Sequence, residues 1–182
     1  MSNPLLLKPF WITRWLSPLA LAVALAGCTY HIKVNPVAVS GDTVMLRGPQ
    51  SITLKNGYSS ESKIVISKGM GLAMDADLMQ LTDAAITMMS RHLGKNGIAV
   101  GGGEKTITLR VRDLKANIFS YSTTTYTDTF LNLEAQMGDG TVSMVPAQNR
   151  STKNPPTSIE GALLFSVTGL LNDARFVGYV NH

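Results

Sequence analysis

A chain of 182 residues allows one domain of ordinary size, and a hydrophobic content of 45% excludes an intrinsically disordered chain. The formal charge of +4 falls to +2 without Lys8 and Arg14, because 14 basic and 12 acidic side chains then remain. So small a surplus, without a basic cluster, argues against a protein that binds nucleic acid. The single cysteine, Cys28, cannot form an internal disulfide.

The N-terminal segment, residues 1–27, is predicted to be a cleaved signal peptide. Lys8 and Arg14 make its first part basic, and residues 15–26 form an apolar stretch of 12 residues. A transmembrane helix needs about 20 apolar residues, so this stretch is too short to cross a bilayer. A basic start, a short apolar region and small residues at its end are typical of a signal peptide.

The residues Leu25-Ala26-Gly27-Cys28 resemble the lipobox of bacterial lipoproteins. The resemblance implies cleavage between Gly27 and Cys28, a diacylglycerol on the Cys28 thiol and acylation of the new amine. Two or more acyl chains make such an anchor stable. Thr29 stands where the family's inner-membrane retention signal is Asp, which implies the outer membrane, with the domain facing the periplasm. The alternative is a plain secretory signal with a chance cysteine.

Residues 28–50 are predicted to be a lipid-anchored tether, and residues 51–182 a single domain. Short runs with the composition of strands occur at 31–34, 43–46, 51–54 and 63–66. Asn56-Gly57 favours a tight turn between the last two runs, but their spacing is too long for a two-residue hairpin. The pairing of these two strands therefore stays open.

Residues 75–93 show the clearest helical pattern. Asp75 is expected to cap the N-terminus, and Asp77 and Asp83 fall early, where the helix dipole favours anions. Gly94 is expected to end the helix. A broad apolar stripe indicates packing on a sheet. The stripe consists of Leu78, Met79, Leu81, Ala85, Ile86, Met88, Met89 and Leu93.

Three strands are predicted to follow as an antiparallel meander. Residues 106–112 and 126–137 alternate between apolar and polar side chains, and 141–145 begins a third strand after a turn at 138–140. The alternation predicts these core-facing side chains: Ile107, Leu109, Val111, Leu131, Leu133, Ala135 and Met137.

Residues 146–157 are polar and contain prolines, which predicts a loop. Thr157 and Glu160 then match a capping box, in which the two side chains bond each other's backbone amides. The helix that follows is expected to bury Ile159, Leu163, Val167, Leu170 and Ala174. The order strand, helix, three strands, helix (β-α-β-β-β-α) indicates an α+β fold. We expect an antiparallel sheet of about four strands with two helices packed on one face.

Residues 101–106, GGGEKT, invite comparison with a phosphate-binding loop. Such a loop needs glycine directly before the lysine, so that the backbone can approach phosphate, and Glu104 stands there instead. A helix is also predicted before the segment and a strand after it, the reverse of the phosphate-loop order. We therefore expect that this segment binds no nucleotide and is a flexible connection between the helix and the strand.

No catalytic, metal or cofactor site is predicted. His31, His92 and His182 are not spaced as metal ligands, and no second cysteine can complete a set. Asp75 and Asp77 fit a helix start better than a catalytic pair. An enzyme is therefore not expected. The observation that would favour one is a polar pocket that clusters Asp113, Asp128 and Glu134.

Four aromatic residues lie in or beside the STTT segment between two predicted strands: Phe119, Tyr121, Tyr126 and Phe130. One interpretation is a hairpin tip whose rings fold onto the sheet edge. The other is a contact surface for a partner or lipid, since exposed aromatic side chains often anchor interfaces. Phe130 belongs to that surface if it shares a face with Asn132 and Glu134.

Over roughly residues 60–175 the chain resembles the YajG-type outer-membrane lipoproteins, which are uncharacterised. The matching features are the lipobox, KIVIS before the long helix, HLGKNGIAVGGG leading to TITLRVRDLKANI, the aromatic hairpin and the turn at Ala135–Gly140. The resemblance implies an envelope lipoprotein and no particular activity. We expect a non-enzymatic protein that binds an envelope protein partner. The alternative is an accessory lipoprotein in lipid or lipopolysaccharide transport, which an apolar cleft between helices and sheet would favour.

Overall fold

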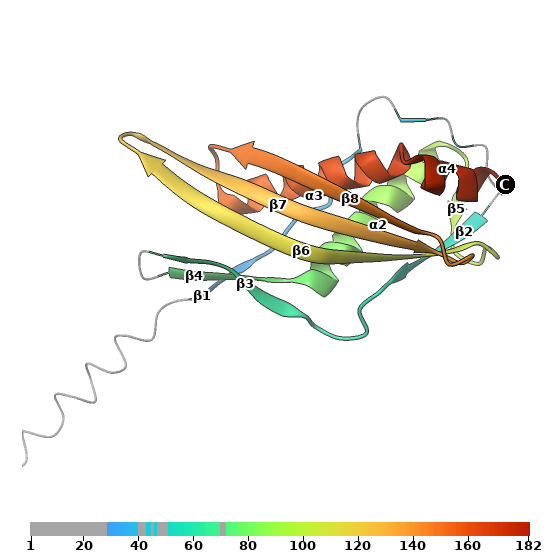
Figure 1. Cartoon of the computed structure of the whole chain (residues 1–182), viewed down its shortest axis with the longest axis horizontal. Coiled ribbons are helices and arrows are strands. Elements are labelled where there is room, and N and C mark those ends of the chain that lie inside the picture. The colour runs from blue at the N-terminus through green and yellow to red at the C-terminus, as the bar shows by residue number, and fades with distance from the viewer. Residues whose placement is uncertain (1–28, 40–42, 45, 47–50, 70–71) are drawn as a thin grey trace, which may run out of the picture.

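The computed structural model describes residues 29–39, 43–44, 46, 51–69 and 72–182. The predicted signal peptide, its cleavage site after Gly27 and the lipidation site Cys28 lie outside these residues and stay predictions. Figure 1 shows the elements along the chain: β1 (Thr29–Ile32), β2 (Ser51–Asn56), β3 (Lys63–Gly69), β4 (Leu72–Asp77), α2 (Leu78–Lys95), β5 (Ala99–Val100), β6 (Thr106–Tyr121), β7 (Thr124–Met137), β8 (Val142–Ser151), α3 (Pro155–Leu171) and α4 (Ala174–Asn181).

The larger sheet has five strands in the order β5-β2-β6-β7-β8. β6, β7 and β8 are antiparallel neighbours, which confirms the predicted meander. β2 runs parallel to both β5 and β6, so the sheet is mixed. The α+β class is confirmed, but the expected purely antiparallel sheet of about four strands is wrong. Parallel neighbours require a crossover, and here the chain passes through α2 between β2 and β6.

A second sheet of three strands has the order β1-β4-β3. β3 pairs antiparallel with β4, and β1 pairs parallel with it. The pairing of 51–54 with 63–66 that the sequence left open does not occur, because β2 and β3 lie in different sheets. The run 43–46 forms no strand at its described residues Thr43, Val44 and Leu46.

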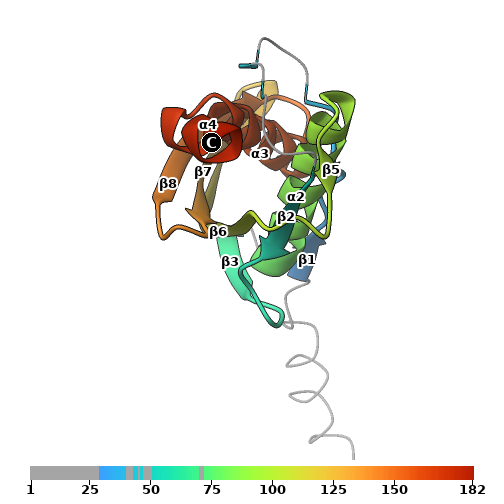
Figure 2. The same cartoon turned by 90° about the vertical axis from the view of Figure 1, so that its right-hand side faces the viewer.

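Helices α2 and α3 cover the inner face of the larger sheet (Figure 2), as predicted. α2 contacts β2 and β6, and α3 contacts β7 and β8. The core-facing strand residues are buried as predicted: Ile107, Leu109, Val111, Leu131, Leu133, Ala135 and Met137. The short helix α4 was not predicted, and it adds the fully buried Phe176 and Val180 to this core.

Helix α2 begins later than its sequence pattern predicts. Asp77 is its N-cap, and the Asp77 carboxylate accepts hydrogen bonds from the amides of Met79 (3.0 Å) and Ser62 (2.9 Å). Asp75 lies in β4 instead, paired with His31 across the β1–β4 ladder. The helix also continues through Gly94 to Lys95, so the expected start and end are both corrected.

Helix α3 and the strand before it also differ from the prediction. β8 continues to Ser151, through half of the expected loop. The N-cap of α3 is Asn154, whose side chain accepts from the Thr157 amide at 2.9 Å. The predicted capping box is therefore wrong, and Glu160 accepts a bond from the Asn35 amide instead. Of the five residues expected to be buried, only Ala174 is exposed, because it begins α4.

A β-bulge at Arg112 changes the side on which β6 presents its residues. The register with β7 shifts between Val111 and Asp113, so odd-numbered residues face inward before the bulge and outward after it. Helix α2 and Tyr58 satisfy the backbone there. The Val111 amide donates to the Thr82 hydroxyl (3.0 Å), and the Tyr58 hydroxyl donates to the Val111 carbonyl (2.7 Å). These two hydrogen bonds satisfy the backbone groups of Val111 and so stabilise the bulge.

The described part of the predicted tether belongs to the folded domain. β1 is a strand of the smaller sheet, and the Asn35 amide donates to the Glu160 carboxylate at 3.0 Å. Leu46 is buried in the core. The folded domain therefore includes Thr29 and does not begin at residue 51. No helix in the described part of the chain is long and apolar enough to cross a membrane.

Candidate functional site

The outer face of the larger sheet, turned away from the helices, carries the predicted contact residues. From Thr129 to the end of β7, buried and accessible side chains alternate, and Phe130 is 42% exposed between the buried Thr129 and Leu131. It shares its side of β7 with Asn132 and Glu134. Phe130 therefore lies on the same face as Asn132 and Glu134, as the contact-surface interpretation requires.

Three rings at the end of the β6–β7 hairpin form a stack on this outer face. Tyr126 lies between the other two, with its centroid 5.1 Å from that of Phe119 and 5.9 Å from that of Tyr121. Tyr121 is 65% exposed and Phe119 is 38% exposed. We call Phe119, Tyr121 and Tyr126 the aromatic stack. The rings do not fold into the core, because the bulge at Arg112 has turned Phe119 and Tyr121 outward.

Arg150 from β8 adds a positive charge to the aromatic stack. Its guanidinium lies 4.5 Å from the centroid of the Tyr126 ring, within the range of a cation–π contact. Arg150 also donates two hydrogen bonds to the Asp128 carboxylate, at 2.6 and 2.7 Å. These bonds lower the pKa of Asp128 and raise the pKa of Arg150. The paired carboxylate holds the guanidinium in place over the ring.

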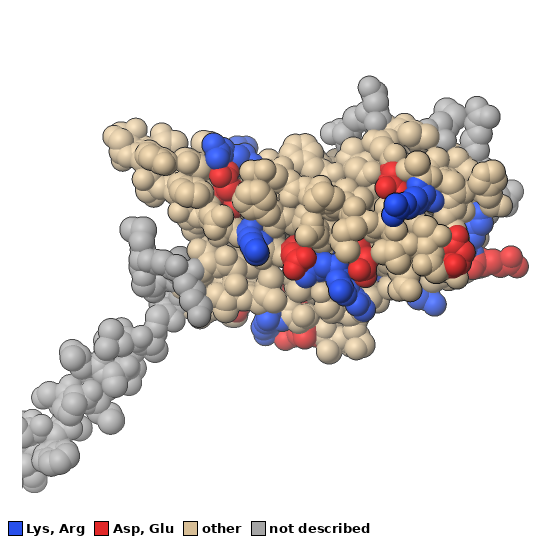
Figure 3. All heavy atoms as spheres, viewed as in Figure 1, with Lys and Arg blue, Asp and Glu red and all other residues tan. Residues whose placement is uncertain are grey.

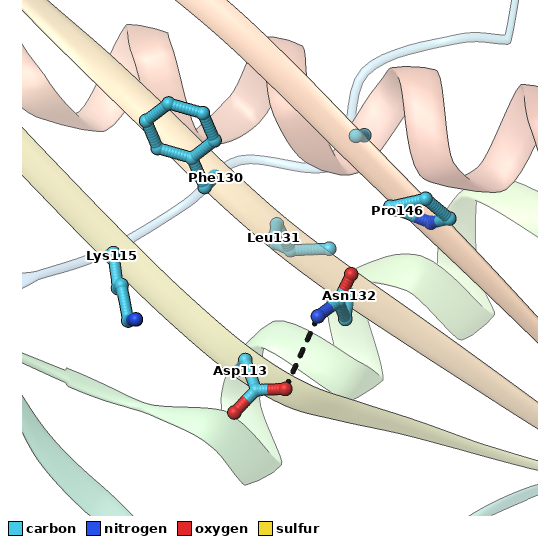
Figure 4. A pocket seen from close by; sticks show the side chains of 7 residues that line it. Asp113, Lys115, Phe130, Leu131, Asn132 and Pro146 are labelled. Atoms are coloured by element: carbon cyan, nitrogen blue, oxygen red, sulfur yellow. Dashed lines mark hydrogen bonds between the residues drawn. The ribbon is translucent and has the colours of Figure 1, made fainter.

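A groove of about 410 Å³ lies around Phe130, further along the same face (Figure 4). Phe130 and Pro146 project on either side of it, and Lys115 borders it from β6. At its far end the Asn132 amide donates to the Asp113 carboxylate at 3.2 Å. The groove thus has apolar walls and a charged end.

The end of the hairpin is uncharged over a continuous stretch. Residues 118–127 contain no acidic or basic side chain. In Figure 3 the projecting end of the molecule is accordingly tan, and blue and red atoms begin further along the strands. We call the aromatic stack, Arg150 and the groove beside Phe130 the outer surface.

The inner face of the same hairpin borders a second hollow, which we call the inner cleft. It has a volume of about 400 Å³ and lies where the two sheets and the start of α3 meet. Its lining includes Tyr30, Met74, Ile118, Thr127, Lys153 and Pro156. Most of the surface that lines the inner cleft is carbon.

The glycine-rich segment at 101–106 serves the fold in two ways. Gly103 packs against the backbone of Ser51 and Ile52 so closely that a side chain would overlap them. The Lys105 ammonium donates to the carbonyl oxygens of Tyr179 (2.8 Å) and Val180 (3.2 Å) at the end of α4. Lys105 therefore fixes the C-terminal helix.

The polar residues considered as ligands or catalysts are dispersed. His31 pairs with Asp75, and His92 lies 2.9 Å from the Thr43 hydroxyl. Within the described residues, no group of three or more His, Cys, Asp or Glu side chains could hold a metal ion. The acidic residues named as a possible cluster each contact a different partner. The pairs are Asp113 with Asn132, Asp128 with Arg150, and Glu134 with Arg112.

Sequence reasoning missed the residues that β8 contributes to the outer surface. Pro146 and Arg150 were assigned to a loop because proline normally interrupts strands. β8 is the edge strand of the sheet, where a residue without an N–H is tolerated. Exposed and half-buried residues alternate from 144 to 151 in the structure, but the residue types there show no matching apolar–polar alternation.

Comparison with known proteins gives matches in structure only. No family model matches the chain, and no curated protein matches its sequence. The fold is similar to that of a DUF330 protein from Xanthomonas campestris, with a TM-score of 0.44 and 13% identity over 85% of this chain and 94% of that one. It is also similar to a minor lipoprotein from Acinetobacter baumannii, with a TM-score of 0.38 and 11% identity over 77% and 93%. The YajG-type resemblance therefore stays a prediction.

Proposed function

We propose that the chain is a non-enzymatic bacterial envelope lipoprotein that binds an envelope protein through its outer surface. A lipid on Cys28 would hold it in the outer membrane, with the domain in the periplasm. The observation that carries the proposal is the aromatic stack, in which three partly exposed rings and Arg150 are ordered on one face.

The chemistry of the outer surface suits a protein partner. Tyrosine, phenylalanine and arginine are enriched in interfaces, where rigid rings contribute contact area at a small entropic cost. Stacking and the bond between Arg150 and Asp128 order these side chains before a partner arrives. The groove beside Phe130 offers a recess for an apolar side chain of that partner.

The experiment that tests this function is crosslinking in cells, followed by purification and mass spectrometry. We expect Tyr121→Ala combined with Tyr126→Ala to abolish co-purification of the crosslinked partner with little change in melting temperature. Phe165→Ala is a matched control, because Phe165 is an aromatic residue on α3 that is 54% exposed. An unchanged partner yield would contradict the proposal. A large decrease in melting temperature would show that the rings stabilise the fold and do not serve as a contact surface.

A second candidate function is an accessory role in lipid or lipopolysaccharide transport. The inner cleft favours it, because a hollow of about 400 Å³ lies between sheet and helix where the sequence left this possibility open. Ligand pockets for small molecules commonly begin at about 300 Å³. The two candidates use opposite faces of the same hairpin and are compatible.

A further inference from the structure

The inner cleft has a buried floor and an exposed rim. Met74 from β4 and Thr127 from β7 form the floor, with 3% and 2% of their surfaces exposed. Tyr30 and Ile118 are 49% and 42% exposed and stand at the rim. Ile118 lies on the inner face of β6. The helices cover its neighbours on that face, Leu114 and Ala116, but leave Ile118 exposed.

The start of α3 makes one wall of the cleft apolar. A helix N-terminus normally offers unpaired N–H groups, which attract anions. Here Pro155 and Pro156 occupy the first two helical positions and have no N–H. The next amide, that of Thr157, already donates to Asn154. This wall therefore presents carbon where most helices present hydrogen-bond donors.

The size of the cleft matches one hydrocarbon chain. A water molecule takes up about 30 Å³ and a methylene group a similar volume, so about 400 Å³ holds on the order of a dozen methylenes. The carbon-rich floor and wall suit such a chain, since transfer of methylenes from water is favourable at each group. The cleft is therefore large enough for about one acyl chain.

The cleft lies at the end of the domain where the chain leaves the proposed anchor. Tyr30 is its rim residue on β1, two positions after Cys28, and the tip of the β6–β7 hairpin lies at the same end of the molecule (Figure 1). Lys153 is an exposed cation on the rim. A lipid phosphate is the group that a lysine at this position would meet.

We propose that the inner cleft binds one acyl chain of a membrane phospholipid, with the phosphate of that lipid at Lys153. This proposal rests on the second candidate function, the role in lipid transport. It adds that the ligand is a phospholipid. Charge complementarity favours a phospholipid over the lipid on Cys28, because an acylated diacylglycerol carries no phosphate for Lys153.

Photo-crosslinking of the full chain in bacterial membranes tests the proposal. A benzophenone amino acid replaces Ile118 at the rim, and the irradiated, purified protein is examined by intact mass and by peptide mass spectrometry. We expect a phospholipid adduct on the peptide that contains position 118. The same amino acid in place of Met144, which is 47% exposed on the outer face of β8, is expected to give no lipid adduct.

The headgroup contact is tested in the same experiment with a second substitution. Lys153→Glu should lower the yield of the phospholipid adduct severalfold, whereas Lys55→Glu, an exposed lysine on β2, should leave it unchanged. Melting temperatures of all variants report whether the domain still folds.

Four results would overturn the proposal. The first two are an adduct between position 118 and the N-terminal lipopeptide and an adduct with lipid A in place of phospholipid. The other two are equal lipid adducts at positions 118 and 144 and the absence of any adduct in a folded variant. The intact mass reports separately whether Cys28 is lipidated, so failure of the anchor is distinguishable from failure of the cleft.

Discussion

Gly103 allows the glycine-rich segment to pack closely against the backbone of β2. A Cβ atom built there would lie 2.2 Å from the Ser51 carbonyl oxygen and 2.7 Å from the Ile52 Cα. Both neighbours are backbone atoms of a paired strand, so neither can move without disturbing the sheet. The requirement for glycine comes from this close approach.

Gly103→Ala should therefore destabilise the domain. Overpacking of this kind costs about 1–3 kcal/mol, and thermal or urea unfolding measures it. Gly94→Ala is the matched control, because no atom lies within 4 Å of the added methyl and the residue is in helix α2. It should raise stability by up to about 1 kcal/mol. Equal effects of the two changes would contradict the packing account.

His92 makes stability depend on pH. Burial, together with the charge of Lys95, lowers the pKa of His92 below its ordinary 6.5. The unfolded chain therefore binds a proton more readily than the folded one. Stability from neutral His92 is fully present above pH 6.5 and is lost as pH falls through the lowered pKa.

Melting temperatures at pH 7.5 and pH 5.5 (about one unit above and below the unfolded pKa) test this account. We expect a larger drop for the unmodified protein than for His92→Gln, which keeps a polar group near the Thr43 hydroxyl but does not titrate. Identical drops in the two proteins would show that other groups cause the acid sensitivity.

At the scale of elements, the bulge in β6 determines which residues belong to the outer surface. Residue type alone was enough to select Phe119, Tyr121, Tyr126 and Phe130 as candidates. Their direction was not predictable, because extending the alternation from Ile107 would have turned the first two rings into the core. The backbone at the bulge bonds to Thr82 on α2, which lies 29 positions away in the sequence, and this contact leaves no mark in the local pattern of β6.

The start of α3 illustrates a second limit of sequence patterns. Thr157 and Glu160 fit a capping box, yet Asn154 stands three residues earlier and reaches the Thr157 amide first. The two prolines after Asn154 favour the first helical turn because their backbone angle is already suitable. Asparagine followed by proline was the stronger start signal.

Asn154→Ala should lower the stability of the domain by about 1 kcal/mol, the usual cost of removing an N-cap side chain. Thr157→Ala is the matched control, and it should have a smaller effect because the Thr157 amide bonds through the backbone. Chemical denaturation of both variants measures the difference. A larger loss for Thr157→Ala would restore the capping-box interpretation.

At the scale of the whole molecule, local patterns predicted the meander and both long helices, but not the division into two sheets. β1 meets β4, and β2 meets β6, only through contacts between residues that lie about 40 to 55 positions apart. Neither pairing leaves a periodic signal in the sequence. β4 was also concealed, because its last residues run directly into α2 without a loop.

The predicted attachment of the whole molecule to a membrane can be tested at Cys28. Cys28→Ala should abolish incorporation of labelled palmitate and leave an uncleaved precursor. Thr29→Asp is the companion variant, and it should keep the label but move the protein to the inner-membrane fraction. Continued labelling of Cys28→Ala would refute the lipobox resemblance.

The parallel pairing of β1 with β4 limits how far a lipid-anchored form of this protein can travel from its membrane. Thr29 already belongs to a sheet, so a single residue step, about 3.8 Å, separates the folded domain from Cys28. Many proteins on long flexible leaders search a wide volume of solvent. If Cys28 is lipidated, this domain would stay within about its own length of the membrane, and a partner would have to come to the membrane surface to bind it.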